Sequence, residues 1–169
     1  MILNYKKLRK NAITPRRAYP SDAGMDLYYC PNDPEEPAIK IPNGQSAQIP
    51  TGIAIEVPHG YMLLGLDKSG IASKKHLLLG GGVIDPGYAG ELMVNLNNVY
   101  GEYEIESGST GYIVRPSKEI IIEPGDKVAQ VVLVPIVHFR LQETKDELYT
   151  DPIVMSDRGT GGFGSTGVK

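Results

Sequence analysis

Apolar and polar residues alternate in two stretches of this chain, and three other stretches are short apolar runs. The alternating stretches are residues 53–57 and 92–96, and the apolar runs are residues 61–66, 120–122 and 128–134. Successive side chains of a β-strand point to opposite faces, so alternation indicates a half-buried strand. A short apolar run is typical of a strand buried on both faces. We therefore predict strands at all five places.

Four tripeptides that combine proline or glycine with a polar residue lie between these strands. They are Pro42-Asn-Gly44, Pro58-His-Gly60, Asp85-Pro-Gly87 and Glu123-Pro-Gly125. Proline fixes its own φ, and glycine reaches positive φ at no steric cost, so each tripeptide predicts a tight turn. Many short strands joined by such turns predict an all-β fold, which is a sandwich, a barrel or a jelly roll.

One short stretch, Ser69–Lys75, has a helical pattern, with Ser69 as the expected cap of its first turn. The hydroxyl and open N–H groups at such a start are also suited to a phosphate, although capping is the commoner role. Residues 100–118 carry two glycine-containing turns and mixed charge, so we expect an insertion that projects from the sheet. We interpret it as a surface arm, with an element that binds a protein partner or shields the site as the alternative. Residues 1–156 are expected to form one domain.

Composition narrows the class of protein. The 169 residues carry a formal net charge of −3, which argues against general binding to nucleic acid or membranes, because both need clustered basic charge. The basic residues Lys6, Lys7, Arg9 and Lys10 are interpreted as a solvated face. The single cysteine, Cys30, excludes an intrachain disulfide and suits a reducing compartment. No apolar run could span a bilayer, and the first residues lack a signal-peptide pattern, so we expect a soluble cytoplasmic protein.

The last stretch, residues 157–169, is rich in glycine, which on composition alone is most often a disordered end. Its Gly-x-Gly-x-x-Gly pattern resembles a dinucleotide fingerprint, but neither the flanking strand and helix nor the later acidic residue is there. The stretch also carries the guanidinium of Arg158, the hydroxyls of Ser165 and Thr166, and the aromatic ring of Phe163. Such groups can wrap a phosphorylated planar ligand. We therefore expect a mobile lid that orders when a ligand binds.

Five short motifs occur in order along the chain. They are Ala23-Gly-Met-Asp26-Leu27, Lys68-Ser69-Gly70, Gly82-Val-Ile-Asp85-Pro-Gly-Tyr88-Ala-Gly90, Gly125-Asp126-Lys-Val-Ala-Gln130 and Arg158–Gly167. Each motif by itself is more often a turn with a solvated acid than a catalytic site. As an ordered set they resemble the motifs of the trimeric deoxyuridine triphosphatases (dUTPases), and the resemblance runs from about Ala18 to Gly167.

The resemblance implies a jelly-roll homotrimer in which three subunits contribute motifs to each active site. The family hydrolyses dUTP with Mg²⁺ to dUMP and pyrophosphate, which keeps uracil out of DNA and supplies dUMP for thymidylate synthesis. By this resemblance Asp85 orients the attacking water, Tyr88 packs on deoxyribose, and Asp26 holds Mg²⁺ through coordinated water. Asp126 gives structural support.

The remaining substrate-binding residues are implied by the same resemblance. They are Lys68, Ser69, Gly70, Gly82, Val83, Ile84, Gln130, Arg158, Phe163, Gly164, Ser165 and Thr166. Among them, Gly82 and Val83 offer backbone groups to the uracil edge, and Phe163 stacks on the base. Arg158 and the two hydroxyls hold the γ-phosphate.

The second motif departs from the family pattern, which begins with arginine where this chain has Lys68. In the family that arginine pairs with the aspartate of the fourth motif, here Asp126. Lysine keeps the charge but loses the planar two-pronged fork, so we expect the contact to be weaker or rearranged. The interval between the third and fourth motifs is also longer than in compact members of the family.

Two rival functions remain at the level of sequence. A dCTP deaminase has the same fold, but it needs a glutamate where this chain has Asn95 and an arginine where it has Ser73. An amide cannot carry the proton that deamination requires. A regulatory nucleotide-binding protein would not need the intact Asp26, Asp85 and Tyr88. The three histidines lack metal-ligand spacing and are interpreted as structural or surface residues.

Overall fold

The computed structural model describes residues 1–33, 35, 38–100, 103–108, 111–116 and 119–145. The chain divides into two compact units, Met1–Val137 and His138–Lys169. The described residues form strands and one short helix, so the predicted all-β class is confirmed. No helix of the described part is long and apolar enough to cross a membrane.

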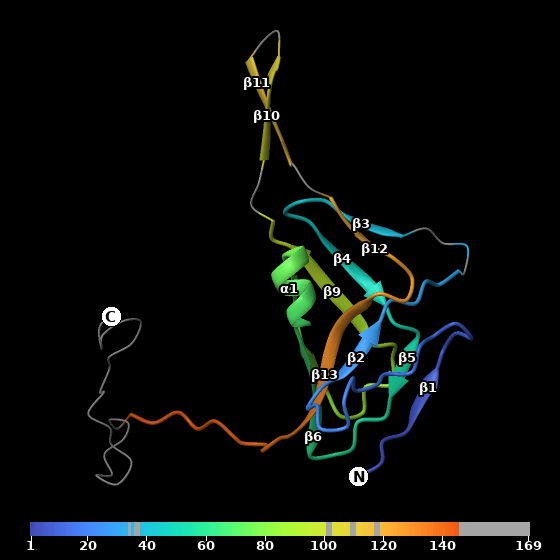
Figure 1. The fold of residues 1–169 in the computed structure, drawn as a ribbon. Coiled ribbons are helices and arrows are strands. Elements are labelled where there is room, and N and C mark those ends of the chain that lie inside the picture. The colour runs from blue at the N-terminus through green and yellow to red at the C-terminus, as the bar shows by residue number, and fades with distance from the viewer. Residues whose placement is uncertain (34, 36–37, 101–102, 109–110, 117–118, 146–169) are drawn as a thin grey trace. The chain divides into compact units, whose positions relative to one another are not determined.

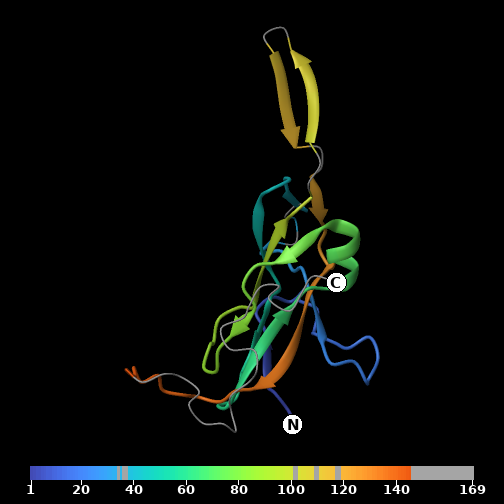
Figure 2. The same ribbon diagram turned by 90° about the vertical axis from the view of Figure 1, so that its left-hand side faces the viewer.

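The strands form a jelly roll of short antiparallel sheets (Figures 1 and 2). The largest sheet has the order β2-β13-β6-β8, with β2 at Met25–Tyr28, β6 at Tyr61–Leu66, β8 at Val83–Ile84 and β13 at Lys127–Pro135. A second sheet has the order β4-β9-β7, with β4 at Ser46–Pro50, β7 at Leu77–Leu79 and β9 at Met93–Asn98. Two strand pairs complete the body: β1 (Tyr5–Lys7) with β5 (Ile53–Ile55), and β3 (Ile39–Ile41) with β12 (Ile120–Ile122).

Side-chain alternation along the strands builds the core. Along β9, alternate residues from Val94 to Asn98 are buried, and the residues between them are partly exposed. In β12, Ile120 and Ile122 are buried, whereas Ile121 is 45% exposed. The predicted strands at residues 53–57, 61–66, 92–96, 120–122 and 128–134 are thereby confirmed, because each stretch holds an observed strand.

The four predicted turns are also confirmed. Their glycines, Gly44, Gly60, Gly87 and Gly125, have φ angles of +75°, +83°, +84° and +88°. An L-residue with a Cβ is strained at these angles, so glycine sets the turn at each position. The turn at Gly87 matters most for the site, because it shapes the loop between β8 and β9.

Helix α1 spans Ser69–Lys75, the range that the sequence predicts, but the predicted cap is wrong. Lys68 occupies the N-cap position with an extended backbone, and no side chain caps the helix. The Lys68 carbonyl accepts hydrogen bonds from the amides of Ile71 and Ala72 at 2.8 and 2.9 Å. The helix therefore begins one residue earlier than a Ser69 cap would allow. In both views α1 lies beside the start of β13 (Figures 1 and 2).

The predicted insertion contains a β-hairpin. Strands β10 (Tyr103–Gly108) and β11 (Gly111–Pro116) pair antiparallel, from Tyr103 opposite Pro116 to Gly108 opposite Gly111. Neither strand joins another sheet of the described chain. Its role as a surface arm or a partner-binding element stays a prediction.

Candidate active site

The sheet register brings the first, second and fourth motifs together. Gln130 on β13 lies opposite Asp26 on β2 and opposite Leu66 at the end of β6. The Gln130 amide donates a hydrogen bond to the Asp67 carbonyl at 2.9 Å. A Cβ at Gly24 would overlap the Gln130 amide oxygen, so a larger residue there would push the Gln130 side chain aside. Three strands thus place two predicted site residues and the start of the second motif side by side.

Asp26 is a buried carboxylate between two lysines. Its side chain is 5% exposed; Lys68 Nζ lies 2.8 Å from Oδ1 and Lys127 Nζ lies 2.8 Å from Oδ2. Burial raises the pKa of Asp26, but the two ammonium groups outweigh burial and hold the pKa below its ordinary value. The carboxylate in turn raises the pKa of Lys127. We call these three side chains the Asp26 cluster, in which two positive charges face one negative charge.

The second oxygen of Asp26 bears on the predicted magnesium site. Oδ2 is buried, and besides the ion pair with Lys127 it has no hydrogen-bond partner among the described residues. Such an oxygen can accept a hydrogen bond from a water on Mg²⁺, an ion that proteins commonly bind through one or two carboxylates and substrate phosphates. No three His, Cys, Asp or Glu side chains gather into a metal site in the described ranges. One carboxylate such as Asp26 can hold a magnesium ion only together with ligands from outside the chain, such as phosphates.

Lys68 does not pair with Asp126, so the family-type contact is rearranged, as the sequence led us to expect. Asp126 instead accepts from Lys75 Nζ at 3.3 Å and from the Glu123 amide at 3.2 Å. Lys75 lies in the last turn of α1, which is seen beside the start of β13 in Figures 1 and 2. Lys68 Nζ instead lies 2.8 Å from Asp26 Oδ1. Asp126 remains a residue of the turn before β13.

Asp85 lies near the opposite end of β6 from the Asp26 cluster. Ile84 on β8 pairs with Leu63 on β6, so Asp85 comes level with Met62 near the start of that strand. Lys68 follows the other end of β6, six residues beyond Met62. Within the strand, Asp26 is level with Leu66 through Gln130, four residues from Met62. At about 3.3 Å per residue this is roughly 13 Å along β6. The strands β2 and β8 are also separated by β13 and β6 in the sheet. One chain therefore brings the Asp26 cluster together but leaves the exposed Asp85 apart from it.

The other predicted residues of the second and third motifs lie beside strand β6 or directly after its C-terminal end. Ser69 and Gly70 are exposed at the start of α1, and a Cβ at Gly70 would meet no atom within 4 Å. Gly82 packs against Gly65, whose amide donates to the Gly82 carbonyl at 2.6 Å. Val83 is 62% exposed on β8. Arg158, Phe163, Gly164, Ser165 and Thr166 lie outside the described residues.

Two cations near the motifs were missed or misread at the level of sequence. Lys127 belongs to the fourth motif, and its position next to Asp126 is the sequence signal that could have found it. Its ion pair with Asp26 follows from the fold. Arg9 was grouped with solvated lysines, yet its side chain is 17% exposed and forms an ion pair with Glu91. Nothing local in the sequence indicates that pair, because the partners are 82 positions apart.

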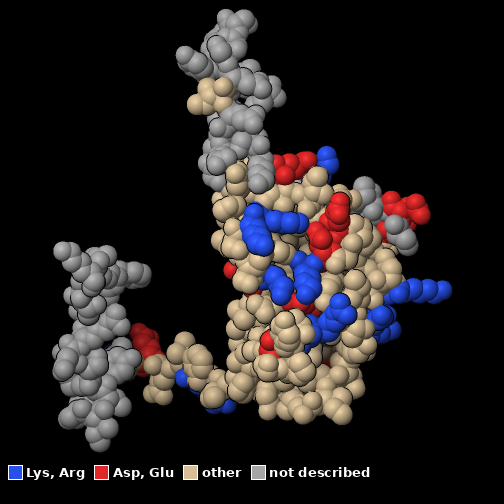
Figure 3. Space-filling model, in the orientation of Figure 1, with Lys and Arg blue, Asp and Glu red and all other residues tan. Residues whose placement is uncertain are grey.

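Charge is unevenly spread over the surface. On the face shown in Figure 3, lysine and arginine side chains gather over α1 and the adjoining end of β13. The lysines of the Asp26 cluster and Lys75 lie in these elements or directly before them. A concentration of cations beside open N–H groups is suited to a polyphosphate.

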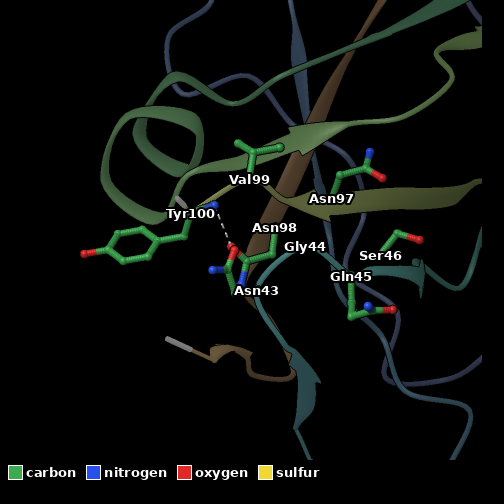
Figure 4. A pocket seen from close by; sticks show the side chains of 8 residues that line it. All are labelled: Asn43, Gly44, Gln45, Ser46, Asn97, Asn98, Val99 and Tyr100. Atoms are coloured by element: carbon green, nitrogen blue, oxygen red, sulfur yellow. Dashed lines mark hydrogen bonds between the residues drawn. The ribbon is translucent and has the colours of Figure 1, made fainter. Parts of the chain in front are cut away.

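A polar pocket elsewhere in the unit holds none of the motif residues. It has a volume of about 360 Å³ and is lined by the β3–β4 turn and the end of β9 (Figure 4). Asn98 is buried there; it donates to the Ile41 carbonyl at 2.8 Å and accepts from the Tyr100 amide at 3.0 Å. The amide side chain therefore serves to join the sheets, and the pocket is not the predicted site.

Comparison with known proteins places this geometry in a family. The dUTPase family model matches residues 10–110 and 111–167. A deoxyuridine 5′-triphosphate nucleotidohydrolase of Hydrogenobaculum sp. is 36% identical over the full length of both chains. One from Clostridium acetobutylicum is 36% identical, and the alignment covers 99% of this chain and 97% of that protein.

Solved structures agree with the sequence comparison. The dUTPase of Staphylococcus bacteriophage 80alpha with dUpNHpp superimposes with a TM-score of 0.78 at 31% identity, over 99% of both chains. A variant of the dUTPase from phage phi11 of S. aureus, described with a structural Mg(II) ion, gives a TM-score of 0.69 at 30% identity over 88% of this chain and 99% of that one. With the motifs in order on a jelly roll and matches over its whole length, the chain belongs to the dUTPase family.

Proposed function

We propose that this protein hydrolyses dUTP to dUMP and pyrophosphate with the help of Mg²⁺. The observation that carries the proposal is the Asp26 cluster: a buried carboxylate between Lys68 and Lys127, next to Gln130, in a chain of the dUTPase family. A triphosphate brings about four negative charges, which need cations and N–H donors in close array. Deamination is not favoured, since Asn95 on β9 is an amide that cannot move a proton.

At the phosphate end, the two lysines exchange partners when substrate arrives. Lys68 and Lys127 are 27% and 41% exposed, so their ammonium groups can turn from Asp26 toward phosphate oxygens. Asp26 would then hold the magnesium ion through coordinated water, and Gln130 would donate its amide to a phosphate. When bound, Mg²⁺ neutralises charge on the triphosphate and on the leaving pyrophosphate. Asp26 orients that ion and does not react itself.

At the other end, Asp85 receives the proton of the attacking water. The water oxygen forms a bond to the α-phosphorus, the bond from that phosphorus to the α–β bridging oxygen breaks, and pyrophosphate leaves with the bond electrons. Asp85 is exposed on the loop after β8, where solvent can supply the water. The Gly82–Ile84 backbone meets the uracil edge, and Tyr88 packs on deoxyribose.

The active unit is a homotrimer whose sites are shared between subunits. Two observations support this assembly. Asp85 and the Asp26 cluster lie near opposite ends of β6, roughly 13 Å apart along the strand, and on strands β8 and β2 that two other strands separate, so a second subunit must supply one of them. After β13 the side chains of Val137, Phe139 and Leu141 are 88%, 78% and 91% exposed at alternate positions, which is the pattern of an extended segment that packs on another chain.

On the evidence of their sequence, residues 157–169 complete the site as a lid. Arg158, Ser165 and Thr166 bind the γ-phosphate and Phe163 stacks on uracil, while Gly164 lets the chain approach the ligand closely. A cytoplasmic location is also proposed, because Cys30 is a buried free thiol of the kind that persists in a reducing compartment. Removal of residues 158–169 should abolish most turnover and leave the trimer intact.

Release of pyrophosphate from a panel of nucleotides tests the proposed function. We expect turnover of dUTP with Mg²⁺, loss of turnover with a chelator, and poor turnover of dTTP, dCTP and UTP. Formation of a uracil nucleotide from dCTP would show a deaminase instead. Absence of turnover with all four nucleotides would leave only a binding function.

A further inference from the structure

Arg9 lies before the first motif but is fixed in a network that reaches the third. Its guanidinium donates to both carboxylate oxygens of Glu91, at 3.0 Å to Oε2 and more closely to Oε1. It also donates to the Asn32 side chain at 3.0 Å and to the Cys30 carbonyl at 3.2 Å. Lys10, the next residue, is exposed. A bidentate arginine contact of this kind fixes both direction and distance.

Glu91 directly follows the third motif and anchors the end of its loop. Besides Arg9, its Oε1 accepts a hydrogen bond from the Gly52 amide at 2.6 Å. Burial raises the pKa of Glu91, but Arg9 and the Gly52 amide together hold that pKa below its ordinary value. The carboxylate is therefore ionised and held on two sides. The loop from Asp85 to Glu91 consequently has a fixed end.

Tyr88 depends on that fixed end. Its hydroxyl donates a hydrogen bond to the Glu91 carbonyl at 3.0 Å, and its ring covers Gly90, where a Cβ would lie 2.5 Å from the hydroxyl oxygen. The other connection is the turn at Gly87, in which the Tyr88 amide donates to the Asp85 carbonyl at 3.3 Å. The ring is 46% exposed, so little packing besides these contacts holds it.

We propose that Arg9 is a positioning residue that fixes the Tyr88 ring through Glu91 and so sets discrimination between deoxyribose and ribose nucleotides. The inference rests on the proposed function, in which Tyr88 packs on the sugar. A ring rejects a 2′-hydroxyl only if it cannot retreat, which requires placement to within about 0.5 Å. Without Arg9, Glu91 loses its bidentate partner and the loop can shift. The ring then moves enough to admit ribose.

The ratio of kcat/KM for dUTP to kcat/KM for UTP tests this inference. We expect Arg9→Met to lower the ratio about tenfold, mainly through a higher kcat/KM for UTP. Arg9→Lys, which keeps the charge but not the two-pronged contact, should lie between wild type and Arg9→Met. Lys10→Met removes the same charge from an exposed neighbour and should leave the ratio unchanged. A partly unfolded sample lowers both constants by one factor, so the ratio reports positioning rather than folding.

Tyr88→Phe removes the hydrogen bond that joins the ring to Glu91 and provides an independent test. It should lower the ratio as Arg9→Met does, and the double variant should show no further loss, because both changes break the same connection. An unchanged ratio in folded Arg9→Met would overturn the inference. If that variant does not fold, unchanged ratios in Arg9→Lys and Tyr88→Phe overturn it equally. Wild-type protein that does not prefer dUTP contradicts the proposed function instead, whatever Arg9 does.

Discussion

Two carboxylates with cationic partners, Glu91 and Asp26, stand at opposite ends of the site region and are held in different ways. Glu91 has a bidentate arginine and a backbone amide, and its side chain is 18% exposed. Asp26 is more deeply buried, at 5%, but its partners are two lysines on flexible stems. In the described part of the chain, one Asp26 oxygen has only the Lys127 ammonium as a polar partner.

We infer that Glu91 is a permanent anchor, whereas Asp26 can exchange its partners. An arginine fork and an amide lose much of their interaction when either partner moves, so Glu91 keeps the third-motif loop in place. Lysine ammonium groups are point charges that can turn to another anion at little cost. The Asp26 cluster is therefore suited to release its carboxylate when a triphosphate arrives. The predictions below contrast these two regions.

The largest effect is expected from Asp85→Asn, which removes the proton acceptor from the loop that Glu91 anchors. The rate constant kcat should fall by about 10²–10⁴-fold, because a positioned base contributes on that order. Affinity for dUpNHpp should stay near wild type, since the amide has almost the same shape. Steady-state pyrophosphate release and equilibrium binding measure the two quantities. Glu119→Gln, an exposed carboxylate paired with Lys40, is the control.

Mixed trimers test whether the two regions of one site come from different subunits. Asp85→Asn and Asp26→Asn proteins should each be nearly inactive. Unfolded together and refolded as an equal mixture, they should recover about one quarter of wild-type activity, because each shared site then has a one-in-four chance of both native carboxylates. No recovery in trimers shown by mass to be mixed would mean that each site lies within one chain.

Stability should be more sensitive to Arg9 than to the lysines of the Asp26 cluster. Arg9→Met leaves the Glu91 charge buried without its main partner and should lower the free energy of unfolding by about 3 kcal/mol. Denaturant unfolding followed by circular dichroism measures the change. A loss equal to that of Lys40→Met, which breaks an exposed pair, would contradict the anchor role.

Acid should weaken the Glu91 anchor in a defined range of pH. The folded-state pKa of Glu91 lies below its ordinary value of 4.5, so its contribution to stability is present above that pH and is lost as pH falls through the folded pKa. The difference in unfolding free energy between wild type and Glu91→Gln should thus be constant above about pH 5.5 and shrink below about pH 4.5. A free-energy difference that grows in acid would contradict a lowered pKa for Glu91 in the folded protein.

The smallest effect is expected from Lys127→Met. Its side chain is 41% exposed, and Lys68 remains to balance Asp26, so the loss of stability should be about 1 kcal/mol or less. Affinity for dUpNHpp with Mg²⁺ should fall at the same time, because a phosphate partner is lost. Unfolding and binding measurements on one sample separate the two effects. Unchanged affinity would show that Lys127 does not contact a phosphate.

Local sequence features predicted most of the fold. The turn at Gly87 and the bounds of α1 follow from glycine, proline and helical spacing within a few residues, and the structure has both. The Ser69 cap failed because the choice between two adjacent caps depends on which carbonyl accepts the first helical hydrogen bonds. Of the site residues, the register of β2 and β13 explains why Asp26 and Gln130 belong together, which the motif order alone does not.

By itself the sequence determined the all-β class, the turns, the order of five motifs and hence the family, because these depend on local backbone preferences and on residue identity. Only the tertiary structure decided the partners: Lys68 and Lys127 on Asp26, Lys75 on Asp126, and Arg9 on Glu91. Charged side chains pair with whatever the fold brings within about 4 Å, and that distance is set by sheet register rather than by separation along the chain. The same register places Asp85 away from the Asp26 cluster, which is why the proposed site needs a second subunit.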